Sequence, residues 1–291
     1  MTTPATDPAP DTRGTPALRV VAITVTFRRE DVLPRVVDAV VAQTRPPDTY
    51  FVIDNGGTAR AVLGERLGVS VIEAGGNMGV SGGYARALRE ALAAGADLVW
   101  AIDDDVVPDR ACLATLLEHR AAHDASIVLP RQRREEGSGY WLLWNGGLLD
   151  ADLVRKLGPP TDYFYWAEDV DYLTRARRAG ARVERVPLEL VTHRAVGRRS
   201  RGEPRDWRLY YVTRNTLHFR LRVKGARLAE RLRIWWGLAK TAAAIVLLEG
   251  HKRRSVGLLR AGIRDYHRGV LGRTIDPEAW TAQYRQRASS T

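Results

Sequence analysis

The sequence predicts an α/β fold with a mostly parallel central sheet flanked by helices, followed by a C-terminal helical appendage. Strand-like and helix-like segments alternate from residue 19 onward, acidic and glycine-rich stretches follow several strands, and the charge balance changes sharply in the last third of the chain. Hydrophobic residues make up 45% of the 291 positions, which is enough for a large packed core.

The first quarter of the chain alternates between two periodicities. Apolar, β-branched runs predict strands at residues 19–26, 50–53 and 69–72, and apolar residues at helical spacing lie between them, at 32–43 and 59–67. This order joins parallel strands through right-handed crossovers, so it predicts a parallel sheet. Further strands are expected at 98–102, 126–129 and 182–187, further helices at 85–94, 113–120 and 168–179, and a charged flexible loop at 131–139.

Three consecutive carboxylates, Asp103, Asp104 and Asp105, follow the strand at residues 98–102. They repel one another, and carboxylate oxygens suit Mg²⁺ or Mn²⁺ as the counter-charge. Asp103 and Asp105 lie on the same side of an extended chain, so both can reach one ion or its bound phosphates. Because ligands of open α/β sheets bind at the carboxyl ends of strands, a metal site is favoured here. A solvated acidic turn or a helix cap is the alternative.

A glycine-rich stretch at residues 75–84 opens the predicted helix 85–94. Backbone amides at a helix N-terminus attract anions, so the stretch predicts contact with phosphate. It matches neither the Walker spacing nor the dinucleotide fingerprint, and a plain turn is the alternative.

Four aromatic residues at 163–166 lead into Glu168 and Asp169. Acids are favoured in the first turn of a helix, so the stretch is either a helix start or a carboxylate base beside an aromatic floor for a sugar ring. His193 follows the last predicted strand and is either structural or a third ligand beside the acidic triplet.

Charge divides the chain into two parts. Residues 1–193 carry 22 Lys and Arg against 27 Asp and Glu, whereas residues 194–291 carry 23 against 7. The basic last third predicts a polyanionic partner, and a membrane surface is favoured over nucleic acid because no recognition motif accompanies the charge. Residues 1–16 lack the features of a signal peptide and are expected to be a disordered tail. The single cysteine, Cys112, fits a reducing compartment.

The last third also predicts two amphipathic helices, at residues 228–249 and 256–271. The apolar part of the first helix falls short of the ~20 residues that span a bilayer. Trp235 and Trp236 beside basic residues suit a helix lying in the headgroup layer, and a hairpin packed on the preceding domain is the alternative. The predicted organisation is a tail at 1–16, a main domain at 17–222 and a basic helical region at 223–291.

Taken together, these stretches resemble the family 2 inverting glycosyltransferases, which have the GT-A nucleotide-diphospho-sugar transferase fold. The resemblance covers roughly residues 19–220. It rests on six pieces in the family's order: Thr-Val-Thr-Phe-Arg-Arg, Val-Ile-Asp-Asn-Gly-Gly, Asn-Met-Gly-Val-Ser-Gly-Gly-Tyr, Asp-Asp-Asp, Trp-Ala-Glu-Asp and Val-Thr-His. Asn145-Gly146 and the stretch Tyr-Tyr-Val-Thr-Arg-Asn at 210–215 resemble the actinobacterial galactofuranosyl- and rhamnosyltransferases that act on lipid-linked acceptors.

The resemblance implies roles for individual residues. Asp169 would be the catalytic base, with Glu168 as the less favoured candidate, and Asp103, Asp105 and His193 would hold Mn²⁺ or Mg²⁺. Asp54 would hydrogen-bond the pyrimidine. The full donor-binding set would be Thr26, Arg28, Asp54, Asn77, Gly79, Asp103, Asp104 and Arg214, with Arg198 or Arg199 as further phosphate ligands. The set for the acceptor or sugar would be Trp144, Asn145, Gly146 and Trp166.

The implied reaction is metal-dependent, inverting transfer of galactofuranose or rhamnose from a UDP- or dTDP-sugar to a hydroxyl of a lipid-linked or cell-wall glycan. The expected location is cytoplasmic, peripheral on the inner face of the plasma membrane, with no nucleic-acid partner and with homo-oligomer formation left open. Two alternatives are a non-catalytic nucleotide-sugar-fold scaffold at the membrane and a glycosyltransferase acting on a soluble acceptor.

Overall fold

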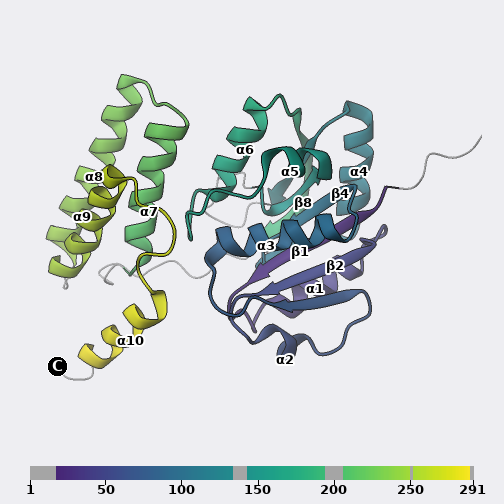
Figure 1. Ribbon diagram of the computed structural model, residues 1–291, viewed down its shortest axis with the longest axis horizontal. Helices are drawn as coiled ribbons and strands as arrows, with labels where there is room; N and C mark the ends of the chain where they lie inside the picture. The colour runs from purple at the N-terminus through teal and green to yellow at the C-terminus, as the bar shows by residue number, and fades with distance from the viewer. Residues whose placement is uncertain (1–17, 134–142, 194–205, 250–251, 289–291) are drawn as a thin grey trace, which may run out of the picture.

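The computed structural model describes residues 18–133, 143–193, 206–249 and 252–288 (Figure 1). The predicted tail, Arg198, Arg199 and most of the predicted charged loop lie outside the described residues.

In the described part of the chain, eight strands form one sheet in the order β3-β2-β1-β4-β7-β6-β8-β5. Strands β1 to β4 pair in parallel, as the strand–helix–strand order predicted. β6 and β8 are also parallel, whereas β7 runs antiparallel to β4 and β6, and β5 to β8. The predicted α/β class is confirmed. The strands are β1 (Val20–Thr26), β2 (Thr49–Asp54), β3 (Val69–Glu73), β4 (Leu98–Ile102), β5 (Val106–Pro108), β6 (Ile127–Arg133), β7 (Asn145–Asp150) and β8 (Val183–His193).

Helices cover both faces of the sheet and form two hydrophobic cores. The first core lies under α1 (Leu33–Val41), α2 (Ala59–Leu63) and α4 (Cys112–His123). The second lies under α3 (Gly79–Ala93), α5 (Ala151–Leu157) and α6 (Glu168–Arg178). The apolar alternation along β1 and β4 supplies both cores, which is why these central strands are buried throughout.

The C-terminal helices gather at one end of the molecule (Figure 1). α7 (Arg208–Leu217) continues into the π-helical turn η1 (His218–Val223) and packs against α9 (Lys252–Arg268), which in turn packs against α8 (Leu228–Leu248). The segment after α9 then returns toward the sheet, and α10 (Pro277–Ala288) leads away from it again toward the C-terminus (Figure 1). Among the described helices, none has both the length and the apolar character needed to cross a bilayer.

Several elements differ from the sequence prediction. Residues 131–133, predicted as flexible loop, continue β6 because they pair with β8. The structure also contains elements that were not predicted, namely β5, β7, α5, α7 and α10. α3 starts at Gly79 rather than at residue 85, since its early glycines fit close contacts that propensity alone does not anticipate.

The pairing brings the sequence motifs to one edge of the sheet. β1, β2 and β4 are parallel neighbours, so their carboxyl ends at Thr26, Asp54 and Ile102 point the same way. Asn145 of β7 pairs with Ile102, immediately before the acidic triplet.

Gly79 at the start of α3 is fitted to this edge in two ways. It has a φ of +70°, and an added Cβ would lie 2.2 Å from the carbonyl oxygen of Phe164. Gly95, at the other end of α3, has a φ of +75° with nothing within 4 Å of an added Cβ.

We predict that Gly79→Ala destabilises the protein more than Gly95→Ala. Both changes place a side chain at positive φ, at a cost of about 1–2 kcal/mol. Only Gly79→Ala adds a clash with a backbone carbonyl, for which we expect about 1–3 kcal/mol more. Urea unfolding of the two variants measures the difference. Equal losses would show that the contact with Phe164 is not maintained in solution.

Candidate active site

The acidic triplet at the end of β4 is held by side chains from three elements. Asp103 accepts a hydrogen bond from the Tyr84 hydroxyl of α3 at 2.7 Å, and its backbone N–H donates to the Trp144 carbonyl at 2.8 Å. Asp105 lies 3.2 Å from His193 Nε2 and 3.4 Å from Arg29 Nη1. Asp105 and His193, which were both predicted as metal ligands, lie side by side because β5 pairs with β8.

Burial concentrates uncompensated negative charge at this edge. Burial and the neighbouring charge of Asp105 raise the pKa of Asp103 to about 8. The same two causes raise the pKa of Asp104 to about 6, although Arg29 acts in the opposite direction. The hydrogen bond to Asp105 raises the pKa of His193. Each shift shows that added positive charge would be favourable here.

Glu168 and Asp169 open α6 beside this triplet. Both are buried, with 6% of each residue exposed. Burial, followed by the charge of Asp169, raises the pKa of Glu168 well above its ordinary value, and Asp103 contributes in the same direction. Burial also raises the pKa of Asp169 to about 6. The acidic pair and the acidic triplet, far apart in sequence, therefore share one electrostatic environment.

Buried polar atoms without a hydrogen-bond partner gather in the same place. Asp169 Oδ1 accepts from the Val170 N–H at 2.7 Å, but Oδ2 has no partner among the described residues. The same holds for Glu168 Oε2, Asn145 Oδ1 and His193 Nδ1. Buried polar groups are normally satisfied, so an unsatisfied group at a strand end indicates a ligand site.

The predicted metal set fits in its chemistry but only partly in its geometry. Carboxylate oxygens and an imidazole nitrogen suit Mn²⁺, and the raised pKa values favour a cation. Asp105 and His193 face each other, whereas Asp103 is turned to Tyr84. Across the described ranges, no three His, Cys, Asp or Glu side chains are grouped so that they could hold an ion together. Of the three predicted metal ligands, the structure brings together Asp105 and His193, and the metal site itself stays a prediction.

The turn after β2 uses the Asp54 carboxylate for its own backbone. Asp54 accepts hydrogen bonds from the N–H groups of Gly56, Gly57 and Ala59 at 2.7–2.9 Å. These bonds hold the turn and leave the predicted contact with a pyrimidine untested. Thr26, also predicted to bind the donor, lies at the end of the neighbouring strand β1 and is buried, with 2% of the residue exposed.

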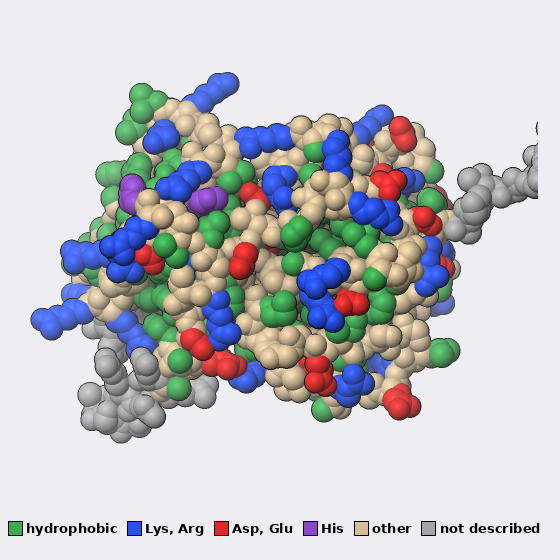
Figure 2. Space-filling model, in the orientation of Figure 1, with side chains coloured by type: hydrophobic (Ala, Val, Ile, Leu, Met, Phe, Trp, Pro, Cys, Tyr) green, Lys and Arg blue, Asp and Glu red, His purple; other side chains and the backbone are tan. Residues whose placement is uncertain are grey.

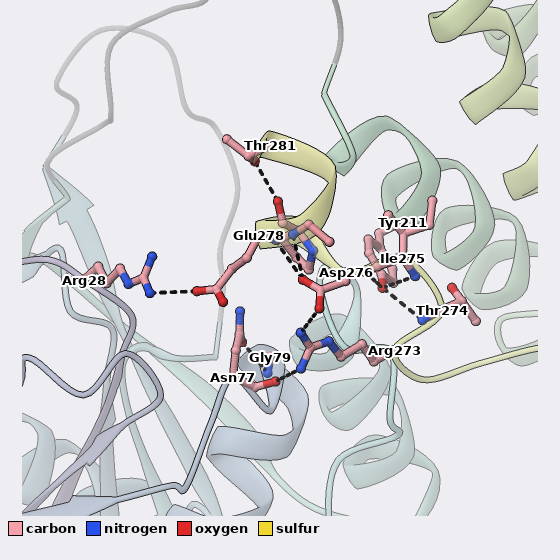
Figure 3. Close-up of polar contacts among 12 residues, drawn as sticks. Arg28, Asn77, Gly79, Tyr211, Arg273, Thr274, Ile275, Asp276, Glu278 and Thr281 are labelled. Atoms are coloured by element: carbon pink, nitrogen blue, oxygen red, sulfur yellow. Dashed lines mark hydrogen bonds and ion pairs between the residues drawn. The ribbon is translucent and has the colours of Figure 1, made fainter. Parts of the chain in front are cut away.

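The start of α3 is joined to the C-terminal segment, as Figure 3 shows. Asn77 Oδ1 accepts from the Gly79 N–H at 2.9 Å, and the Asn77 carbonyl accepts from Arg273 at 3.0 Å. Arg28, predicted to bind the donor, has a φ of +53° and forms an ion pair with Glu278 at 2.8 Å (Figure 3). The segment before α10 and the start of α10 therefore contact two of the predicted donor-binding stretches.

Arg214 is corrected from a phosphate ligand to a buried structural residue. Its side chain is fully buried, and its guanidinium donates to Tyr163 O, Gly272 O and the Asn215 and Thr274 side chains at 2.8–3.2 Å. With its donors directed at protein acceptors, it ties α7 to the aromatic loop and to the C-terminal segment.

Two of the predicted sugar contacts are also corrected. Trp144 is 1% exposed and stacks on Tyr84 with ring centroids 4.1 Å apart, so it supports Asp103 from inside the core. Gly146, with a φ of +96°, lies against Val191 and Pro130 and accepts a hydrogen bond from the Trp100 indole. Trp166, by contrast, is 42% exposed and keeps its predicted availability to a sugar ring.

Three residues that support the site were not predicted from the sequence. Arg29 compensates the triplet, Tyr84 orients Asp103, and Arg273 holds the Asn77 carbonyl. Arg29 and Tyr84 stand inside motifs quoted above, so their positions were visible but their partners were not. Nothing in the local sequence signals Arg273, because its contact spans 196 residues.

A helix-flanked mixed sheet with an acidic triplet after β4, a histidine at the end of β8 and an acidic pair opening α6 is the arrangement of the GT-A nucleotide-sugar transferases, and comparison with known proteins agrees. The model of the family described as "Glycosyl transferase family 2" matches residues 21–179. The chain therefore belongs to glycosyltransferase family 2.

Curated relatives lie in the same family. The chain is 38% identical over 198 residues to "Galactofuranosyltransferase GlfT1" of Mycobacterium tuberculosis, covering 55% of this chain and 65% of that protein. It is 31% identical over 199 residues to the protein of the same name from Mycolicibacterium smegmatis, and this match covers 55% of this chain and 66% of that protein. The match thus spans just under two thirds of these relatives.

Solved structures share the fold. A mannosyltransferase from Pyrobaculum calidifontis, in complex with GDP-Man and Mn²⁺, superposes with a TM-score of 0.57 at 16% identity, covering 93% of this chain and 80% of that one. Staphylococcus aureus TarS in complex with UDP superposes with a TM-score of 0.52 at 13% identity, covering 89% of this chain and 95% of that one.

We predict that Mn²⁺ stabilises the protein through Asp105 and His193. Binding at 100 times the Kd would add about 2.7 kcal/mol of stability, measurable as a rise in Tm. Asp105→Asn should abolish that rise, whereas Asp152→Asn, at an exposed and remote carboxylate, should preserve it. The imidazole must be neutral to bind a cation, so the rise should shrink as pH falls through the raised pKa of His193. A Tm unaffected by millimolar Mn²⁺, with and without UDP, would contradict the assignment.

Proposed function

We propose that this chain is a metal-dependent, inverting glycosyltransferase that moves a sugar from a UDP- or dTDP-sugar to a hydroxyl of a lipid-linked or cell-wall glycan. The observation that carries the proposal is the buried pair Glu168 and Asp169, each with an unpartnered carboxylate oxygen, beside the acidic triplet. Galactofuranose is the favoured sugar because the curated relatives are named galactofuranosyltransferases.

The donor would lie along the strand ends. Asp105 and His193 would hold Mn²⁺ or Mg²⁺, which when bound supplies Lewis-acid stabilisation of the charge on the leaving diphosphate. The start of α3, at Asn77 and Gly79, would lie beside the nucleotide, with the Gly79 and Val80 N–H groups already donating to Asn77 Oδ1 and to the Phe164 carbonyl. Arg29, already beside Asp105, adds positive charge to the same region.

The acidic pair would act on the acceptor. The oxygen of the acceptor hydroxyl would attack the anomeric carbon from the face opposite the nucleotide, and Asp169 Oδ2 would accept the proton of that hydroxyl. One displacement inverts the configuration. Glu168 would orient acceptor hydroxyls, and the exposed ring of Trp166 would offer a face to the sugar.

We predict that Asp169→Asn lowers kcat by about 10²–10⁴-fold, because the side chain keeps its shape and loses its basicity. UDP affinity should stay unchanged. In the wild type, kcat should fall as pH drops below about 6, because the raised pKa leaves Asp169 protonated there. The measurement is a steady-state assay screening UDP-galactofuranose, dTDP-rhamnose and common UDP-hexoses.

Glu168→Gln is the matched variant and should act mainly on acceptor KM. If Glu168→Gln is inactive and Asp169→Asn is active, Glu168 is the base and Asp169 orients the acceptor. Full activity in both variants would refute the mechanism. A well-folded chain that binds no nucleotide would support the non-catalytic scaffold instead.

We further propose that α8 places the enzyme on an anionic membrane surface. Along α8, Leu228, Leu232, Trp235, Ala239, Ala243 and Val246 recur every three or four residues, and all are exposed. Ile234, Leu238 and Ile245 form the opposite face, packed inward. An exposed apolar stripe on a helix that already buries its other face indicates an external apolar partner.

The charge around the stripe favours lipid as that partner. By helical geometry, Arg231 lies along one margin of the stripe and Lys240 along the other, where their ends can reach headgroups while their stems cover apolar surface. Lys and Arg side chains gather over this end of the molecule in Figure 2. Such a helix lies in the membrane interface with its apolar face down.

Trp236 lies in α8 next to Trp235 of the stripe and is also exposed. We predict that Leu232→Glu with Trp236→Glu weakens binding to vesicles containing anionic lipid by at least about tenfold. Both side chains are 62% exposed, so folding should be unaffected. Leu67→Glu, at an exposed leucine of the main domain, is the control and should bind like wild type. Sedimentation with vesicles at low and high salt measures the effect. Wild-type protein that ignores the vesicles, or that dimerises through the stripe in size-exclusion chromatography, would contradict the proposal.

A further inference from the structure

The loop that delivers the acidic pair has an unfavourable backbone. Phe164, Trp166 and Ala167 have φ values of +64°, +74° and +80°, immediately before Glu168. They are three of the five non-glycine residues with positive φ in the described ranges. Side chains at such angles are strained, and the strain persists only where the surroundings hold it.

One buried side chain from α7 contacts most of this loop. Asn215 is fully buried, and its Nδ2 donates to the carbonyls of Tyr163, Tyr165 and Trp166 at 3.0, 2.6 and 3.3 Å. These carbonyls flank the strained residues. A single carboxamide thus compensates the carbonyls that the left-handed backbone turns inward.

The orientation of that carboxamide is set by its neighbour. Arg214 Nε donates to Asn215 Oδ1 at 2.8 Å, so the amide nitrogen must face the loop. Arg214 Nη2 adds a second bond to the Tyr163 carbonyl at 3.0 Å.

The opposite side of the loop is fixed by α3. The Phe164 carbonyl accepts from the Val80 N–H at 2.8 Å and fills the space beside Gly79. The loop is therefore held between the N-terminus of α3, where the donor is expected, and the last turn of α7.

We propose that Asn215 is a positioning residue for the transfer reaction: its carboxamide holds the left-handed loop at residues 163–167 and thereby aims Glu168 and Asp169 at the acceptor. This inference rests on the proposed function of the acidic pair. It assigns no contact between Asn215 and substrate.

The test is Asn215→Asp, which keeps the size of the side chain and the acceptor for Arg214 but removes the donors to the three carbonyls. We expect kcat to fall about 10²-fold, as for a misplaced catalytic group, with donor KM and UDP affinity within about twofold of wild type. Thr115→Val is the control, because it removes only the hydrogen bond from its own hydroxyl to the Ala111 carbonyl at 2.9 Å, in α4 on the other face of the sheet. It should retain near-wild-type kcat.

A second change relaxes the strain directly. Glycine adopts positive φ without strain, so adding Ala167→Gly to Asn215→Asp should restore part of the lost kcat. If Asn215 only filled space in the core, giving the backbone more freedom at residue 167 would not restore the lost kcat. Should Asn215→Asp fail to fold, Asn215→Gln, which displaces the amide, carries the same expectations.

Hydrogen exchange separates this inference from the proposed function, since it needs no substrate. Asn215→Asp should speed exchange at residues 163–170, and Thr115→Val should not. Unchanged exchange, or unchanged kcat in an enzyme that Asp169→Asn inactivates, would overturn the positioning role. Faster exchange in a protein without transfer activity would overturn the proposed function alone.

Discussion

The burial of several carboxylates at one edge of the sheet is the constraint on which the rest of this structure depends. Taking like charges out of water costs free energy that each neighbouring group must reduce. Arg29 and His193 reduce it at Asp105, and the Tyr84 hydroxyl reduces it at Asp103. The compensation is incomplete, because oxygens of the acidic pair stay unpartnered. Such an arrangement of carboxylates favours an added cation or a proton-donating hydroxyl.

Three chain segments distant in sequence meet to hold that edge. The start of α3 contacts the aromatic loop through Phe164, α7 contacts the same loop through Asn215, and the segment before α10 contacts the start of α3 through Arg273. Arg214 and Tyr211 link α7 to that last segment. The C-terminal helices are thus part of the framework of the site, although the family model ends at residue 179.

The same helices carry the exposed apolar stripe of α8 and much of the basic charge. Packing of α7 on α9, and of α9 on α8, connects the aromatic loop to the surface proposed to meet lipid. An acceptor anchored in a membrane would then be presented to a protein whose membrane-facing helix is linked to the loop before Glu168 through α9 and α7. Because the acidic site and the basic helices carry opposite charge, the proposed membrane and metal–diphosphate partners would be drawn to different parts of the molecule.

Local patterns determined the elements of the β1–β4 half-sheet, the identity of the acidic residues and the C-terminal amphipathic helices, because periodicity and strand-end chemistry are encoded within short windows. They could not determine what each polar side chain contacts. Arg214 and Trp144 looked like ligand residues and proved to be buried supports, since burial depends on helices that arrive from later in the chain. The strained approach to Glu168 and its restraint by Asn215 were equally invisible, because a left-handed non-glycine backbone has no sequence signature. Only the tertiary structure decided them: the free energy that keeps such a loop in place comes from contacts about fifty residues away.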